Sequence, residues 1–183
     1  RDSYEKTYSG TAKYKLFRQS DRVPVNISLY GSVDINSQLK KSTYPGLKSF
    51  DRFSYTAQVL ASRRFSKKLS LEVAPIFVRH NLQDLNFTKT QTHNQLLLGM
   101  GGRYKLSKRL SLNMDYAYNF SKNKNSLYHN PLTLGVDIET GGHVFQLLFT
   151  NSRASNDSSF LTETTGEWSK GEISFGFNIV RVF

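Results

Sequence analysis

The sequence predicts an all-β fold, a transmembrane antiparallel β-barrel with about nine strands in these 183 residues. Apolar and polar residues alternate with a period of two, which is typical of strands with two different environments. The alternating segments are roughly 10 to 14 residues long, the length that a tilted strand needs to cross a bilayer. The connections between them alternate between short and long, as they do in outer-membrane barrels.

The expected strands follow one another along the whole chain. In chain order they cover residues 8–16, 23–36, 52–64, 69–77, 94–106, 110–120, 132–139, 143–150 and 173–183. The clearest is 110–120, where apolar or aromatic residues occupy the even positions and polar or small residues the odd ones. Short turns are expected near 19–22, 66–68, 107–109 and 140–142, and long loops near 37–49, 80–92, 121–130 and 152–170.

The last strand carries a bulky apolar face to the end of the sequence. The residues predicted to face lipid are Ile173, Phe175, Phe177, Ile179 and Phe183. Small or polar residues such as Ser174, Gly176 and Asn178 lie between them and are predicted to face inward. This strand predicts a chain in the bacterial outer membrane with its carboxyl terminus in the periplasm.

Composition removes several classes of protein. Only 38% of the residues are apolar, and no run approaches the roughly 18 apolar residues of a spanning helix. The absence of cysteine excludes disulfides and thiolate metal sites. The net charge of +11 suggests nucleic-acid binding at first sight, but the basic residues gather near the short turns. We therefore expect no nucleic-acid partner, but either a basic rim beside lipid phosphates or a rim that recruits an anionic solute or acidic partner.

Two of the predicted turns share a sequence pattern. Residues 64–71 read RFSKKLSL and residues 105–112 read KLSKRLSL. The pattern is an apolar residue, Ser, two basic residues, Leu, Ser and Leu. We interpret it as one structural solution used twice.

The chain also resembles a known family. Residues 141–152, with Gly166, Trp168 and residues 171–179, are similar to an uncharacterised outer-membrane β-barrel family of Gram-negative bacteria, as are residues 4–8 and 13–16. The resemblance implies a single barrel domain over 1–183 that lacks its amino-terminal strand or strands and signal peptide, with about twelve strands in the complete chain. The family carries no activity that could be transferred to these residues.

The inward face is where function is expected, because its charged residues have both signs. They are Asp34, Arg52, Glu72, Arg103, Lys105, Asp115, Asp137, Glu139 and Glu172. These residues either fill a narrow barrel with ion pairs and hydrogen bonds or line a polar pore that selects solutes by charge. The sequence leaves both alternatives open.

No residue pattern points to catalysis or to a bound cofactor. His80, His93, His129 and His143 lack the spacing of a metal site on one element, and the first three are expected in or beside exposed loops. No Gly-x-Ser-x-Gly elbow occurs. We therefore expect no catalytic residue, metal or cofactor.

The sequence thus predicts a non-enzymatic accessory or structural subunit of a larger envelope assembly. The alternatives are a small-solute channel with a mixed-charge lumen and, third, a membrane-embedded lipid-modifying enzyme. Expected partners are outer-membrane lipids and lipopolysaccharide, and other outer-membrane proteins in a complex.

Overall fold

The computed structural model describes residues 6–40, 42, 46–82, 93–123 and 126–181. Its strands are β1 (Thr7–Phe17), β2 (Asn26–Asn36), β3 (Phe53–Arg64), β4 (Leu69–His80), β5 (Asn94–Lys105), β6 (Leu110–Asn119), β7 (Leu132–Thr140), β8 (His143–Thr150) and β9 (Ser174–Arg181). The helical elements are η1 (Ser49–Arg52), α1 (Asp157–Thr162) and η2 (Trp168–Lys170). None of the described helices has the length and apolar character that a membrane crossing requires.

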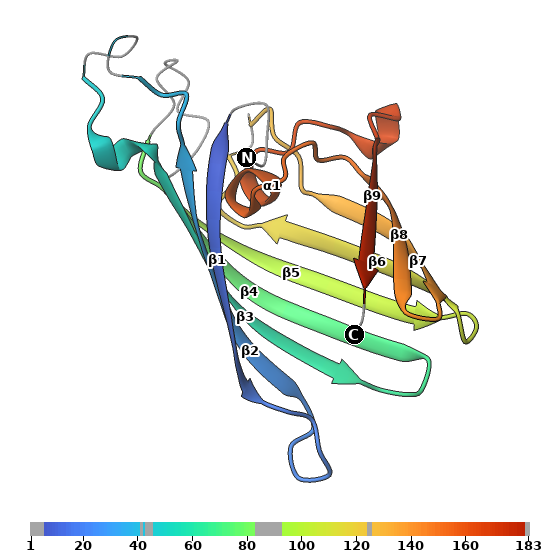
Figure 1. Ribbon diagram of the computed structural model, residues 1–183. Coiled ribbons are helices and arrows are strands. Elements are labelled where there is room, and N and C mark those ends of the chain that lie inside the picture. Colours follow the sequence, from blue (N-terminus) through green and yellow to red (C-terminus); the bar gives the residue numbers. More distant parts are fainter. Residues whose placement is uncertain (1–5, 41, 43–45, 83–92, 124–125, 182–183) are drawn as a thin grey trace.

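The strands form one antiparallel sheet in which every strand pairs with its neighbours in the sequence, from β1 to β9. The sheet curves into a half-barrel around α1, with β1 and β9 on the two sides of its opening (Figure 1). The predicted fold class is confirmed. The number of strands in a complete barrel, about twelve, is not tested by this sheet and stays a prediction.

Short and long connections lie at opposite ends of the sheet. Residues 65–68, 106–109 and 141–142 make tight turns at one end, which we call the turn side. The described parts of the connections between β2 and β3, between β6 and β7 and between β8 and β9 lie at the other end, the loop side. Alternation of short and long connections places all turns of one kind at one edge, because consecutive antiparallel strands reverse direction.

One strand begins later than the alternation predicts. β2 starts at Asn26 rather than at Val23, and residues 18–25 form the connection from β1. Pro24 lies in this stretch and has no N–H to donate to the ladder with the neighbouring strand. The Val23 carbonyl instead accepts a hydrogen bond from the Ser20 N–H at 2.8 Å, which closes a local turn.

The outer face of the sheet is apolar along its whole width. Tyr14, Met114 and Phe175 are 69%, 50% and 62% exposed. Ile173, Phe177 and Ile179, which are predicted to face lipid, are also exposed beside Phe175, whereas Phe183 lies outside the described residues. A soluble protein rarely exposes an apolar surface of this extent, so this face suits apolar surroundings.

Alternation alone predicts a polar inner face. The structure differs, because part of the inner face is apolar. Ala74, Ile76 and Val78 of β4 point inward and are buried with Leu97 and Ala117 of the next two strands. Leu161 of α1 completes this cluster. Residues 73–78 read VAPIFV, so β4 is apolar on both faces where α1 covers it.

The register makes a direct test of the outer face possible at the middle of β6. Met114 points outward and is 50% exposed, whereas the adjacent Asn113 points inward. A cation at the bilayer midplane costs about 2–4 kcal/mol and a carboxylate less. We expect Met114→Asp to lower the membrane-inserted fraction several-fold and Asn113→Asp to leave it near the unmodified level. Heat-modifiability of the protein in the membrane fraction measures this. Equal losses in the two variants would contradict the assignment of the faces.

Candidate functional site: the inner face and its inward-folded helix

Strand pairing fixes which side chains share the inner face, because residues directly opposite one another point to the same side of a sheet. Asp34 lies opposite Ser54, and Ser54 lies opposite His80. Continued around the sheet, the pairing places on the inner face seven of the predicted residues: Asp34, Glu72, Arg103, Lys105, Asp115, Asp137 and Glu139.

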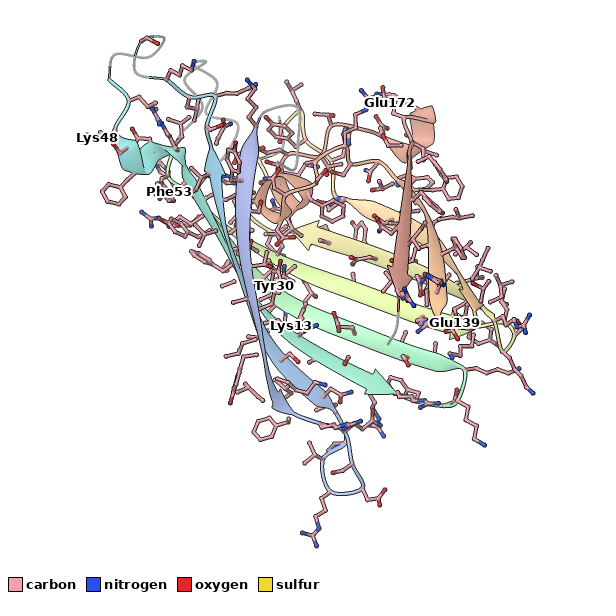
Figure 2. All side chains as sticks on the ribbon, viewed as in Figure 1. Lys13, Tyr30, Lys48, Phe53, Glu139 and Glu172 are labelled. Carbon is pink, nitrogen blue, oxygen red and sulfur yellow. The ribbon has the colours of Figure 1, made fainter. Side chains whose placement is uncertain are left out.

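The other two predicted residues lie at the loop side. Arg52 ends η1, just before β3 begins. Glu172 precedes β9, and its carboxylate accepts a hydrogen bond from the Glu167 N–H at 3.0 Å. Figure 2 shows Glu172 beside η2 at the loop side and Glu139 at the opposite, turn side. The nine predicted residues therefore form no single cluster.

The helix α1 belongs to the connection between β8 and β9, and it lies within the concave face of the sheet (Figure 1). It contacts β2, β3, β4 and β6. The sequence predicts a long outer loop here, and the structure turns part of that loop inward. Three groups of polar contacts and the apolar cluster hold it there.

The first contact is a carboxylate of β2 at the start of the helix. Asp34 Oδ2 accepts hydrogen bonds from Ser158 Oγ at 2.6 Å and from the Ser158 N–H at 3.2 Å. Asp34 and Ser158 are only 2% and 1% exposed. The N-cap residue Asn156 makes no side-chain capping bond, so Asp34 satisfies an N–H that the first turn leaves open.

A second side chain of β2 binds the neighbouring helix residue. The Tyr30 hydroxyl donates a hydrogen bond to the Asp157 carboxylate. Tyr30 and Asp34 lie on the same face of β2, separated by one inward position. Together they fix the direction in which the first turn of α1 enters the half-barrel.

His80 forms the third contact and links the far end of the helix to the wall. Its Nε2 lies 2.8 Å from Thr162 Oγ1, and its Nδ1 lies 2.9 Å from Ser54 Oγ. Thr162 donates its own proton to the Ser158 carbonyl at 2.7 Å. This bonding assigns the neutral tautomer in which Nε2 donates to Thr162 and Nδ1 accepts from Ser54.

The environment of His80 therefore differs from the predicted one. It was expected in or beside an exposed loop, whereas it is 8% exposed and ends β4. The reason is that β4 continues past Phe77 to His80, which brings the ring under α1. The alternation predicted a strand over 69–77 and did not indicate that it continues to His80. In the structure, the register between β3 and β4 pairs His80 with Ser54.

The return from α1 to β9 is held at the rim of the sheet. Asn151 Nδ2 donates to the Gly166 carbonyl at 2.9 Å, and the Trp168 indole N–H donates to the Leu132 carbonyl at 3.0 Å. A Cβ atom on Gly166 would overlap the carbonyl oxygens of Asn151 and Glu172. Gly166 and Trp168, which carry part of the family resemblance, thus shape this return.

An ion pair marks the exposed surface of the same segment. Lys170 Nζ lies 2.7 Å from Glu167 Oε2. The hydrogen bond from Lys170, with a second from the Ser169 hydroxyl, lowers the pKa of Glu167, and the same pair raises the pKa of Lys170. Lys170 is exposed and Glu167 only half-buried, so the pair contributes little to stability.

Below the helix, the interior contains a small cavity and then a group of paired charges. A cavity of about 130 Å³ lies between α1 and the sheet, lined by Glu72, Asp115 and Phe160 among others. Towards the turn side, Arg103 Nη2 lies 3.0 Å from Glu139 Oε1 and 3.5 Å from Asp137 Oδ2. Lys105 Nζ lies 3.8 Å from the same Glu139 oxygen.

The chemistry available to these groups is limited. Ser54 and His80 are within the distance that nucleophile and base require in acyl transfer. However, a threonine hydroxyl occupies the position where a carboxylate would orient the ring, and neither residue lines the cavity under α1. In the described part of the chain, no three histidine or acidic side chains are grouped to hold a metal ion.

Comparison with known proteins agrees with this architecture. The family model of a "membrane bound beta barrel domain", a domain of unknown function, matches residues 1–183. The resemblance found in the sequence is therefore confirmed. No curated protein and no solved structure matches the chain.

The contact between Asp34 and Ser158 predicts how the helix responds to a single substitution. Hydrogen bonds to a charged group contribute about 1.5–3 kcal/mol. We expect Asp34→Ala to lower the protection of the backbone amides of α1 against hydrogen exchange by roughly 10- to 100-fold. Asp51→Ala is the matched control, because Asp51 is a half-buried carboxylate of η1 that binds within its own connection at the Lys48 N–H. Unchanged protection of α1 in Asp34→Ala would show that the carboxylate does not hold the helix.

Proposed function

We propose that this chain, which belongs to the family of membrane-bound β-barrel domains, is a non-enzymatic structural or accessory subunit of a larger envelope assembly. In this proposal its barrel lies in the bacterial outer membrane, with the turn side and the carboxyl terminus in the periplasm. The observation that carries the proposal is α1, which occupies the concave side of the sheet at the loop side and is tied to the wall.

The occupation of the concave side by α1 supports a structural role over a conducting one. Withdrawal of α1 would leave the Asp34 carboxylate and the His80 ring without their partners Ser158 and Thr162. It would also open the apolar cluster around Leu161 to water. An unsatisfied buried polar group costs about 1–3 kcal/mol, and more if it is charged, so the inward position of α1 is the stable one.

The placement in the membrane rests on the asymmetry of the two ends. Short turns at one end and long connections at the other are typical of outer-membrane barrels, whose short turns face the periplasm. The apolar outer face supplies the lipid-facing wall that such a barrel needs. This wall and the long connections are the surfaces that a subunit could offer to other membrane proteins.

A small-solute channel is the second candidate. It is supported by the turn-side half of the interior, where Arg103, Lys105, Asp137 and Glu139 present both signs of charge. Conduction would require the segment that carries α1 to leave the inner face.

A lipid-modifying enzyme has one observation in its favour, the Ser54–His80 contact, but this pair faces inward and away from the apolar wall.

Planar-bilayer recording separates the structural and channel functions. We expect the reconstituted full-length protein to give no stable stepwise conductance. Asp34→Ala combined with Ser158→Ala is expected to give transient openings, because both partners of the first contact to α1 are removed. Stable stepwise conductance from the unmodified protein would refute the closed interior and favour the channel.

Lipid analysis tests the enzymatic alternative separately. We expect phospholipid and lipopolysaccharide to remain unchanged by mass spectrometry after incubation with the full-length protein. Ser54→Ala is the matched variant, since it removes the hydroxyl that contacts His80 Nδ1. Lipid turnover by the unmodified protein that is abolished in Ser54→Ala would overturn the non-enzymatic assignment.

A further inference from the structure

Two turns on the turn side are built in the same way. In the first, between β3 and β4, Ser66 Oγ accepts hydrogen bonds from the N–H groups of Lys68 and Leu69 at 3.1 and 3.0 Å. In the second, between β5 and β6, Ser107 Oγ accepts from Arg109 and Leu110 at 3.2 and 3.1 Å. The repeated sequence pattern is therefore a repeated conformation, in which the serine side chain fixes the backbone of the two basic residues.

The two turns are neighbours and are joined through their backbones. The Lys105 N–H donates to the Lys68 carbonyl at 2.8 Å, so the start of the second turn is bonded to the first. The Arg109 carbonyl in turn accepts from the Glu139 N–H at 2.8 Å. This connection holds four basic side chains along one edge of the sheet, which we call the basic edge: Lys67, Lys68, Lys108 and Arg109.

Among the described residues, no carboxylate pairs with the cations of the basic edge. All four residues are exposed, and none of them takes part in an ion pair among the described residues. The nearby carboxylate of Glu139 is bound to Arg103 and Lys105 on the inner face. Four cations fixed side by side without carboxylates repel one another, so the edge favours an anionic partner.

Apolar side chains adjoin these cations on the outer face. Phe65 and Leu106, the residues that precede the two serines, are 57% and 47% exposed. The guanidinium carbon of Arg63 lies over the Phe65 ring, 5.1 Å from its centroid. This contact places a fifth cation next to the basic edge. The edge thus combines cations at the rim with apolar side chains immediately beside them on the wall.

We propose that the basic edge binds the headgroups of anionic phospholipids in the turn-side leaflet. Such a lipid carries a phosphate next to acyl chains, and this is the order in which the edge presents basic and apolar groups. An acidic polypeptide would match only the cations, whereas one anionic lipid contacts both the cations and the adjoining side chains of Phe65 and Leu106. The inference goes beyond the structural role proposed above, because it does not depend on whether the interior conducts.

Lipid co-purification tests this inference on the full-length protein. The protein is reconstituted in vesicles of equal parts phosphatidylglycerol and phosphatidylethanolamine, extracted gently, and the bound lipids are counted by mass spectrometry. A cation near an anionic surface contributes about fivefold to binding. We expect phosphatidylglycerol to be enriched several-fold over the vesicle ratio, and the enrichment to fall with added salt.

Two variants with the same loss of charge locate the effect. The turn variant carries Lys67→Gln, Lys68→Gln, Lys108→Gln and Arg109→Gln, and should return the lipid ratio to that of the vesicle. The loop variant carries Lys40→Gln, Lys48→Gln, Lys122→Gln and Arg153→Gln, all exposed on the loop side, and should keep the enrichment. Replacement of Lys67, Lys68 and Lys108 by Arg preserves the charge and should also keep it.

Three outcomes would overturn the proposal. The first is an unmodified protein without enrichment, and the second is an equal loss in the turn and loop variants. The third is preferential binding of a polyglutamate peptide to the basic edge in the presence of phosphatidylglycerol, which would assign the edge to an acidic protein partner instead.

Discussion

The arrangement of the interior depends on one buried carboxylate. Asp34 is almost fully enclosed, and it faces the first turn of α1, where Ser158 supplies both an N–H and a hydroxyl. A charge in this position is stable only with such donors, because burial removes the water that would otherwise solvate it. The requirement works in both directions: the helix turn needs an acceptor for its open N–H, and the strand needs donors for its carboxylate.

This interaction holds α1 against the sheet, and the inner face therefore has two different regions, one covered by α1 and one nearer the turn side. Around α1, much of the surface is buried, and apolar side chains of β4, β5 and β6 pack against Leu161. Nearer the turn side, Arg103 and Lys105 pair with acidic residues of β7, and their side chains remain partly exposed. The outer face is apolar behind both regions. The same strands therefore present one kind of surface outward and two kinds inward.

Some features of the site could be predicted from the sequence, and others could not. The inward position of Asp34, Glu72 and the acidic residues of β7 follows from the period of two along each strand. The covered stretch of β4 breaks this rule, since residues 73–78 are apolar at almost every position. That run is the one sequence signal that something packs on the inner face, and it does not say which segment does so.

The sequence by itself determined the fold class, the nine strands and the two faces of each strand, because alternation is a local property that a few neighbouring residues define. The tertiary structure alone decided that part of the last long connection turns inward and that Asp34 meets Ser158. These two residues are 124 positions apart, and their contact depends on how strongly the sheet curves and where the connection crosses it. Curvature is the sum of small twists over all strands and is not encoded in the pattern of any one strand.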